Sequence, residues 1–351
     1  MKKKLLSVLM AAVMVAGVGG VGAAQVKADD EKILGAGIYS ASDNFNSYIG
    51  KAITNACDGI FKTNIEVGQN DQSTQNNQVD TMLAKGASAV AVSVCDVTAA
   101  PTLIQKCKDA GNVPIIFFNK EITDYDVINS YENAYQVTST GGDYGASIQA
   151  QMVIDYWKEH PEMDKNGDGK LQLVYLMGDP GHTASQPRCD YLKSTIEDAG
   201  IEIDLLAEDT GMWVTATAKE KMDAWVSKYG DEIECCVAGN DAMALGALSA
   251  VEAAGFNTDG EESSKYIPIY GIDALPEILS KIESGEITGS VLQDAKTQGQ
   301  TIVKMAENLT SGKDAVDGIE GVEVEEEAKA VRVPYQAITK DNLDLAKSTY
   351  E

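Results

Sequence analysis

The sequence has few basic residues, few prolines and no second long apolar segment after its N-terminus. Lysine and arginine number 28 against 54 aspartates and glutamates, which gives a formal net charge of −26. Such an acidic surface repels phosphate backbones and anionic lipids, so we expect no nucleic-acid binding and no membrane insertion after processing. Only 8 prolines accompany 32 glycines, and 44% of the residues are hydrophobic. This composition favours a compact α/β protein over long disordered tracts.

Familiar catalytic signatures are also missing. There is no G-x-S-x-G elbow, no phosphate-binding loop and no H-E-x-x-H motif, and there are only two histidines, His160 and His182. Asp43 and Asp273 are the best enzymatic candidates, because two carboxylates can cleave a glycosidic bond. Nothing in the sequence marks either of them as an acid with a raised pKa. We therefore expect a protein that is not an enzyme, with a calcium-dependent extracytoplasmic glycosidase as the alternative.

The six cysteines include no C-x-x-C pair. An even number of cysteines in an exported chain permits disulfides. However, Cys95, Cys235 and Cys236 lie in apolar runs typical of strands. We expect buried free thiols that pack as small apolar side chains.

The first 28 residues have the pattern of a secretory signal peptide. Three lysines precede a short apolar core and then small residues, and we expect cleavage after Ala28. Gly17, Gly19 and Gly22 spell a dinucleotide fingerprint, but they fall within this leader and outside any βαβ unit. There is no cysteine near the expected cleavage point, so the sequence does not indicate a lipid anchor. We expect an exported monomer in the periplasm or another extracytoplasmic space.

Short apolar runs alternate with helical patterns along the rest of the chain. Nearly continuous apolar strands that alternate with helices indicate parallel sheets covered on both faces. Five runs precede residue 140 and five follow it, which predicts an α/β fold with two doubly wound lobes. The ten expected strands are 32–39, 64–68, 89–95, 113–119, 134–139, 171–178, 201–209, 235–239, 267–273 and 287–293.

Polar and aromatic side chains follow most of these strands. Ligands of such sheets bind at the carboxyl ends of the strands, so a cleft between two lobes is the expected site. Planar hydrogen-bonding groups and aromatic faces suit a neutral polyol such as a sugar. Any single Asp or Asn here, such as Asn240 or Asp273, is equally open to a role as a helix N-cap. The candidates are Asp43, Phe45, Asn119, His182, Arg188, Trp213, Asn240, Asp241, Asp273 and Gln293.

The segment DKNGDGKLQ at 164–172 resembles the first nine residues of a calcium loop. An EF-hand closes with a bidentate Glu at position 12, but Tyr175 stands there, within an apolar strand. Parallel strand pairing makes Glu234, at the start of another strand, the candidate for the missing carboxylate. A turn without metal is the alternative. The expected ligands of a structural Ca²⁺ are Asp164, Asn166, Asp168, Gln172, Glu234 and the Lys170 carbonyl.

Long stretches of the chain resemble the galactose/glucose-binding proteins of bacterial ABC importers, within the type I periplasmic binding proteins. The resemblance covers nearly all of the chain after the leader. It is carried by YSASDNF (39–45), DKNGDGKLQ (164–172), GDPGH (178–182), GNDAMALGA (239–247), GIDALPE (271–277) and VRVPYQAITKDNL (331–343). It implies a two-lobed receptor that closes on a hexose and delivers it to a permease. A chemotaxis receptor is a second implied partner, and a sensor-only sugar-binding protein is an alternative function.

The resemblance also assigns roles to the candidate residues. Phe45 and Trp213 correspond to the family's stacking aromatics, and Glu234 corresponds to its remote calcium ligand. The implied polar sugar contacts are Asp43, Asn119, His182, Arg188, Asn240, Asp273 and Gln293.

This sequence departs from the family pattern at two positions. Ala184 replaces an Asp that contacts the anomeric hydroxyl, and Gln293 replaces an Asn. Loss of the carboxylate removes a charge-assisted hydrogen bond, worth about 1.5–3 kcal/mol. We therefore expect weaker discrimination at C1 and better acceptance of a glycoside.

The family's hinge implies three chain crossings, near 138–141, 291–294 and 320–326. The expected first lobe comprises 29–139 and 294–322. The expected second lobe comprises 140–293 and 323–351 and contains the calcium loop.

Overall fold

The computed structural model describes residues 32–350. The predicted signal peptide and its cleavage point lie outside these residues. Within them, no helix is both long and apolar enough to cross a membrane. The ten predicted strands are all present; nine of them lie in two mainly parallel sheets, and the tenth, at 290–292, forms an antiparallel ribbon with a strand near the C-terminus.

The first sheet has seven strands in the order β11-β12-β5-β4-β3-β1-β2, and only the β11–β12 pair is antiparallel. Its strands are β1 (Ile33–Ile38), β2 (Lys62–Val67), β3 (Ala89–Val92), β4 (Ile115–Phe118), β5 (Ala134–Ser139), β11 (Glu323–Glu325) and β12 (Ala330–Val333). Its helices are α1 (Asn44–Ala56), α2 (Gln72–Ala84), α3 (Ala100–Asp109), α4 (Tyr125–Asn129) and α10 (Ala295–Thr310).

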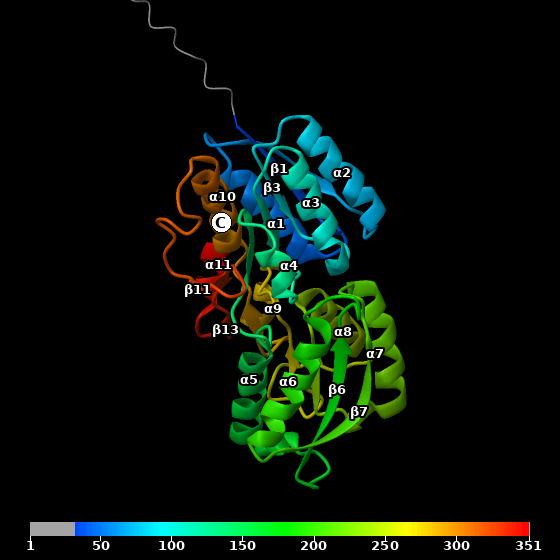
Figure 1. Ribbon diagram of the computed structural model, residues 1–351. Coiled ribbons are helices and arrows are strands. Elements are labelled where there is room, and N and C mark those ends of the chain that lie inside the picture. The colour runs from blue at the N-terminus through cyan, green and yellow to red at the C-terminus, as the bar shows by residue number, and fades with distance from the viewer. Residues whose placement is uncertain (1–31, 351) are drawn as a thin grey trace, which may run out of the picture. The chain divides into compact units, whose positions relative to one another are not determined.

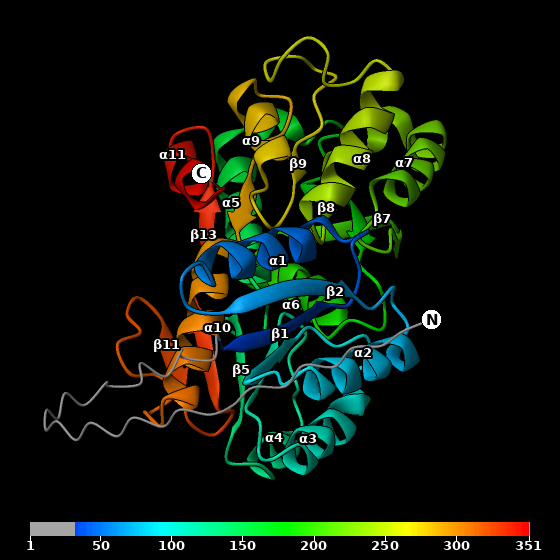
Figure 2. The ribbon, with the colours of Figure 1, turned by 90° about the horizontal axis from the view of Figure 1, so that it is seen from above.

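Alternate residues of the central strands face opposite layers of helices. Val90 and Val92 of β3 pack with α2 and α3, whereas Ala89 and Ala91 pack with α1 and α10. Figure 2 shows β1 and β2 between α1 and α2. Both faces of the strands are therefore buried, which explains why the strands read as continuous apolar runs.

The second sheet has the parallel order β7-β6-β8-β9. Two isolated bridges, Tyr270 with Gly289 and Asp273 with Leu292, connect it to the antiparallel β10–β13 ribbon. α7 and α8 lie side by side on one face of this sheet (Figure 1), and α5 and α6 pack on the other. Its strands are β6 (Lys170–Met177), β7 (Glu202–Thr210), β8 (Cys235–Ala238), β9 (Ile269–Tyr270), β10 (Ser290–Leu292) and β13 (Gln336–Ile338). Its helices are α5 (Ala146–Glu159), α6 (Ser185–Asp198), α7 (Thr215–Tyr229), α8 (Asp241–Ala253), α9 (Pro276–Glu283) and α11 (Leu343–Tyr350).

The structure corrects the position of the third chain crossing. β12 pairs in parallel with β5, from Ala330 beside Gln136 to Val333 beside Ser139. Segment 323–333 therefore belongs to the first lobe, and the prediction that the second lobe resumes at 323 is wrong. The chain crosses at 334–335 and not at 320–326, because backbone pairing holds β11 and β12 on the edge of the first sheet. The other two passages between the sheets follow β5, at 140–145, and β10, at 293–294.

The six cysteines are all unpaired. Five are buried, and Cys95 is partly buried. Burial raises the pKa of Cys57 and that of Cys95 to about 11, so these thiols stay protonated near neutral pH. They act as small apolar side chains, as the sequence predicted.

A buried ion pair fastens β12 to the rest of the first lobe. The Arg332 guanidinium donates to both carboxylate oxygens of Glu121, at 2.8 and 3.2 Å. Its Nη1 also donates to Thr138 Oγ1 at 2.9 Å. Both charged side chains are buried, so neither can exchange its partner for water.

We expect Glu121→Gln to lower the free energy of unfolding by about 3 kcal/mol, because it removes the buried counter-charge of Arg332 and leaves only the half-exposed Glu325. Urea unfolding measures this loss. Asp80→Asn removes a half-exposed partner of Lys106 and serves as the control, with an expected loss below about 1 kcal/mol. Equal losses in the two variants would show that the buried pair carries no special role.

Candidate ligand pocket between the lobes

The carboxyl ends of strands from both sheets meet around one pocket. Asp43 follows β1 and Asn119 follows β4, while His182, Trp213, Asn240, Asp273 and Gln293 follow β6 to β10. Each of the predicted sugar contacts is at most 9% exposed. The pocket is lined by Asp43, Phe45, Asn119, Ser139, Tyr144, His182, Ala184, Arg188, Trp213, Asn240, Asp273, Gln293 and Tyr335.

All nine residues named as sugar contacts are therefore brought together. Asp241 does not line the pocket; its buried carboxylate instead accepts from Ser290 Oγ at 2.6 Å and Leu275 N at 2.7 Å. Sequence reasoning missed Ser139, Tyr144 and Tyr335 as lining residues. These three lie on or beside the chain crossings, which no local sequence pattern marks.

The N-cap interpretation holds for two of the residues. Asp43 caps α1 and accepts from Asn46 N at 3.2 Å, and Asn240 caps α8 and accepts from Met243 N at 3.0 Å. Both nevertheless line the pocket, so capping and ligand contact are compatible here. Asp273 is not a cap, because the N-cap of α9 is Leu275.

Four of the pocket residues have a left-handed backbone. Asn119 has φ = 65°, Tyr144 has φ = 51°, Trp213 has φ = 63° and Asp273 has φ = 124°. Such conformations are costly for residues other than glycine and persist where the surrounding structure imposes them, often at functional sites. The strain aims these side chains into the pocket at the point where each strand ends.

Charge in the pocket is concentrated in buried groups. Burial raises the pKa of Asp43, although hydrogen bonds from Tyr39 and Asn46 oppose the shift. Burial and then the nearby Asp241 carboxylate raise the pKa of Asp273, whereas Arg188 lowers it. These carboxylates therefore depend on neighbouring donors and on Arg188 to remain ionised.

His182 is neutral in this setting. Burial, with help from Lys120 and Arg188, holds the pKa of its imidazole well below the usual range. Nδ1 accepts from Ala184 N at 3.1 Å, so the ring proton belongs on Nε2. Nε2 lies 3.3 Å from Asn119 Oδ1 and links the two lobes across the pocket.

Lys120 is a further buried charge beside the pocket, and sequence analysis did not single it out. Its Nζ donates to the Cys95 carbonyl at 2.8 Å and lies 4.0 Å from the centroid of the Tyr39 ring. The Tyr39 hydroxyl in turn donates to Asp43 Oδ2. These contacts connect Lys120 through Tyr39 to Asp43 and hold the Asp43 carboxylate in place.

The Trp213 indole occupies space that exists because two neighbouring residues are glycines. A Cβ at Gly178 would come within 2.0 Å of the indole ring, and one at Gly239 within 3.2 Å. The indole packs edge-on to His182, with ring centroids 5.4 Å apart. Glycine at these strand ends therefore lets the ring reach the pocket.

We expect Gly178→Ala to displace the indole, to lower the free energy of unfolding by about 2 kcal/mol and to weaken ligand binding. Chemical denaturation and ligand titration measure the two effects. Gly37→Ala is the matched control, because its methyl group would meet its nearest neighbour at 3.6 Å. A Gly178→Ala protein with unchanged stability and affinity would contradict the assigned position of Trp213.

The predicted calcium loop lies at the opposite, amino end of β6. Asp164 accepts from Asp168 N and Gly169 N, at 3.1 and 2.9 Å, and Asn166 Oδ1 accepts from Asp168 N at 2.9 Å. The side chains at positions 1, 3 and 5 thus fold over the loop. Lys170 N closes it by donating to Asp168 Oδ1 at 2.8 Å.

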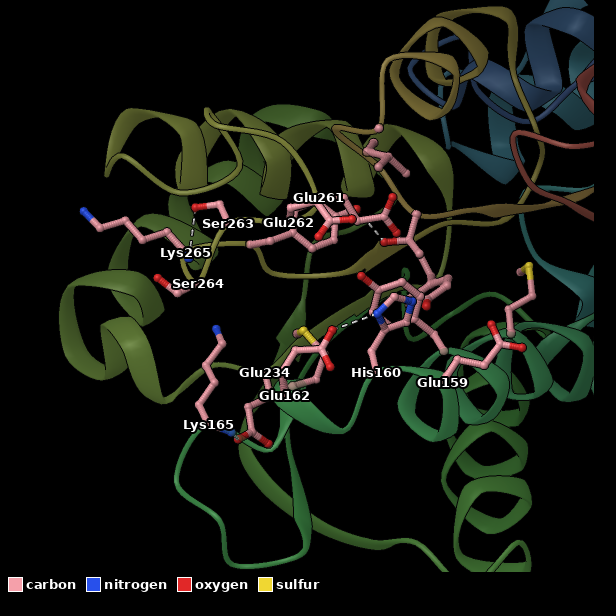
Figure 3. Close-up of a pocket in the computed structure, with 18 of the residues that line it drawn as sticks. Glu159, His160, Glu162, Lys165, Glu234, Glu261, Glu262, Ser263, Ser264 and Lys265 are labelled. Atoms are coloured by element: carbon pink, nitrogen blue, oxygen red, sulfur yellow. Dashed lines mark hydrogen bonds and ion pairs between the residues drawn. The ribbon is translucent and has the colours of Figure 1, made fainter.

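Glu234 lies beside this loop, as parallel pairing of β6 and β8 requires. Its carboxylate accepts from Lys165 N at 2.7 Å and from Gln172 N at 3.0 Å. Figure 3 shows Glu234 and Lys165 in the wall of a broad groove that also contains Glu162 and His160. Burial raises the pKa of Glu234, so a nearby positive charge would stabilise its ionised form.

The side-chain amides of Asn166 and Gln172 direct their nitrogens, rather than their oxygens, toward the Asp168 carboxylate. Asn166 Nδ2 and Gln172 Nε2 both donate to Asp168 Oδ2, at 3.0 and 2.9 Å. Gln172 Oε1 is buried without a partner. Across residues 32–350, no three His, Cys, Asp or Glu side chains are arranged as a ready-made metal-binding group.

Two α/β lobes with a buried polar pocket at the carboxyl ends of their strands define a two-lobed ligand-binding protein. Residues 36–314 match the family model described as the periplasmic binding protein domain, and the chain belongs to that family. The D-galactose/methyl-galactoside-binding periplasmic protein of Haemophilus influenzae is 42% identical over 313 residues, which cover 88% of this chain and 90% of the relative.

More distant matches also extend over most of the chain. A putative rhizopine-binding protein of Rhizobium meliloti is 29% identical over 85% of this chain and 88% of its own length. An ABC transporter solute-binding protein of Bacillus halodurans, solved with myo-inositol, superposes with a TM-score of 0.74 at 27% identity, over 91% of this chain and 98% of that structure.

Proposed function

We propose that this protein is an exported, high-affinity hexose receptor that delivers its sugar to an ABC importer. The observation that carries the proposal is the pocket itself, where nine buried side chains from the strand ends of both lobes converge. The H. influenzae relative supports galactose or methyl-galactoside as the ligand class. Phe45 and Trp213 would cover the C–H faces of a pyranose, and the polar groups would bind its hydroxyls.

The pocket around Ala184 bears on the anomeric end of the sugar. Ala184 is buried in a small apolar cluster with Tyr144, Ile272, Val291 and Tyr335. By the family resemblance, this cluster faces C1 where relatives carry an Asp. An apolar wall at that point favours a methyl glycoside over a free anomeric hydroxyl more than a carboxylate would.

We expect galactose, glucose and methyl-galactoside each to bind with one site in isothermal titration calorimetry, with dissociation constants of about 1 µM or tighter. Trp213→Ala should weaken all three by about 30-fold or more, because it removes a central buried aromatic. Trp225→Phe, on α7 outside the pocket, should leave them unchanged.

Two results would contradict parts of this proposal. Absence of heat with every hexose would reject the receptor function. Tight galactose binding with equal or poorer binding of methyl-galactoside would reject the role given to Ala184. A separate assay with nitrophenyl-galactoside tests the glycosidase alternative, because Asp43 and Asp273 acting as a catalytic pair would release nitrophenol from it.

We also propose that the loop 164–172 holds a structural Ca²⁺. Asp164, Asn166, Asp168, Gln172, Glu234 and the Lys170 carbonyl would bind it. The unpartnered Gln172 Oε1 supports this proposal, and rotation of the Gln172 amide by 180° would turn its oxygen toward the ion. The ion would offset the charge of the loop and stabilise the second lobe by linkage.

We expect Glu234→Gln to abolish the rise in melting temperature that Ca²⁺ gives the wild type, while hexose affinity well below melting stays within about twofold. Differential scanning calorimetry with calcium and with a chelator measures the response. Glu232→Gln, an exposed neighbour two residues away, is the control and should keep the calcium response. Loss of hexose binding in chelator at low temperature would contradict a purely structural ion.

The site of action and the partners complete the proposal. The relatives support a periplasmic or other extracytoplasmic protein whose partner is an importer permease. A chemotaxis receptor is a second proposed partner. Deletion of the gene separates the roles, because transport predicts lost galactose uptake and sensing predicts lost chemotaxis with uptake intact.

A further inference from the structure

The three chain crossings between the lobes all run along the wall of the proposed sugar pocket. They span 140–145, 293–294 and 334–335, and each contributes one lining residue, namely Tyr144, Gln293 and Tyr335. Any change in the angle between the lobes must alter backbone torsions in these segments. The pocket and the hinge therefore share the same residues.

One side chain, Arg188 of α6, hydrogen-bonds to all three crossings. Its Nε donates to the Tyr144 carbonyl at 3.0 Å, and its Nη2 donates to Gln293 Oε1 at 3.1 Å and to the Tyr335 hydroxyl at 3.3 Å. Its Nη1 donates to the Gly239 carbonyl, at the end of β8, at 2.6 Å.

Most of the hydrogen-bond donors of Arg188 already have an acceptor. A guanidinium has five N–H donors, and four of them are used in these bonds. The remaining Nη1 hydrogen is available to a ligand in the pocket that Arg188 lines. The group that would bind the sugar is thus already bonded to every connection between the lobes.

The crossings are also joined to one another. Thr140 N donates to the Val333 carbonyl at 3.0 Å, which links the first crossing to the third. Ser139 hydrogen-bonds to the Tyr335 phenol and accepts from Gln298 Nε2, on α10 after the second crossing, at 3.0 Å. A Cβ at Gly145 would lie 3.1 Å from the Tyr335 ring, so glycine lets the first crossing pass close to the third.

We propose that Arg188, besides its proposed sugar contact, positions the three crossings relative to one another, and that Tyr335 takes part in this positioning. The inference rests on the proposed hexose site for its ligand. Binding of a sugar oxygen to the last Nη1 donor fixes the guanidinium plane, and the other four bonds carry that constraint to each crossing. Sugar occupancy and hinge geometry are then coupled, because both favour the same guanidinium orientation.

The chemistry of the guanidinium makes this role specific. A lysine at position 188 would carry one ammonium group with three donors and no planar fork, so it could not reach acceptors on three separated segments at once. The bonds from Arg188 to the three crossings are called the clamp below. Arg188→Lys keeps the charge and removes the clamp. Tyr335→Phe keeps the charge and the ring, and it removes the hydroxyl that accepts from Nη2 and that also hydrogen-bonds to Ser139.

Hydrogen exchange measured by mass spectrometry tests the clamp without any sugar. In Arg188→Lys we expect exchange to rise about tenfold or more in peptides covering all three crossings, including the amides of Thr140 and Gln293. In Tyr335→Phe we expect a smaller rise, about two- to tenfold, at 293–294 as well as at 334–336, because Arg188 Nη2 bonds to both Gln293 and Tyr335. Rises confined to α6 in the first variant, or to 334–336 and the segment beside Ser139 in the second, would overturn the clamp.

Tyr131→Phe is the matched control. It removes one buried hydroxyl that donates to the Val113 carbonyl at 3.0 Å, within the first lobe. We expect a similar loss of stability with exchange raised only around that bond. Rises at the crossings in this control would show that general destabilisation, rather than the clamp, controls them.

Galactose titration tests the coupling and separates it from the proposed function. Tyr335→Phe should weaken galactose binding about three- to tenfold, mainly through faster dissociation, and Tyr131→Phe should not. Wild-type affinity and dissociation rate in Tyr335→Phe would overturn the coupling. If the wild type binds no hexose, the proposed function fails, while the exchange data still decide whether Arg188 holds the crossings.

Discussion

The hydrogen bonds of one guanidinium connect most features of this structure. Arg188 is buried between the ends of β6 and β8 and reaches the three segments that join the lobes. A buried charge is stable only when its donors are satisfied and an opposite charge is near. Asp273 and the Tyr335 phenol lie close enough to influence the guanidinium, and the crossing segments supply acceptors. The pocket, its electrostatics and the hinge are therefore parts of one arrangement.

The two ends of the second lobe have different physical roles. At the carboxyl ends of the strands, buried side chains with left-handed backbone converge, and their polar groups depend on one another. At the amino ends, the loop 164–172 and Glu234 bring acidic groups together near solvent. A sheet separates the two sites, so a cation at one end can stabilise the lobe without contacting a ligand at the other.

The sequence was sufficient for the features that depend on local pattern. Most of the ten strands are readable because they are short apolar runs, buried on both faces in β1, β3, β4 and β8. The side chains after them converge, since parallel strands end at one edge. Strand pairing and the family resemblance together pointed to Glu234, and the structure places its carboxylate against Gln172 N. β11 and β12 were not predicted, because they are short and because β12 pairs with β5, which is far away in sequence. Their omission misplaced the third crossing and hid Tyr335. The contacts of Arg188, likewise, exist only once three distant segments meet.

A crystal structure of the protein with galactose tests the central claim most directly. The account predicts one sugar between Phe45 and Trp213, hydrogen-bonded to side chains of both lobes, with Arg188 donating to the sugar while it keeps its bonds to Tyr144, Gln293 and Tyr335. Galactose bound elsewhere, such as in the acidic groove beside Glu234, or a pocket sugar without contact to one of the lobes, would contradict it.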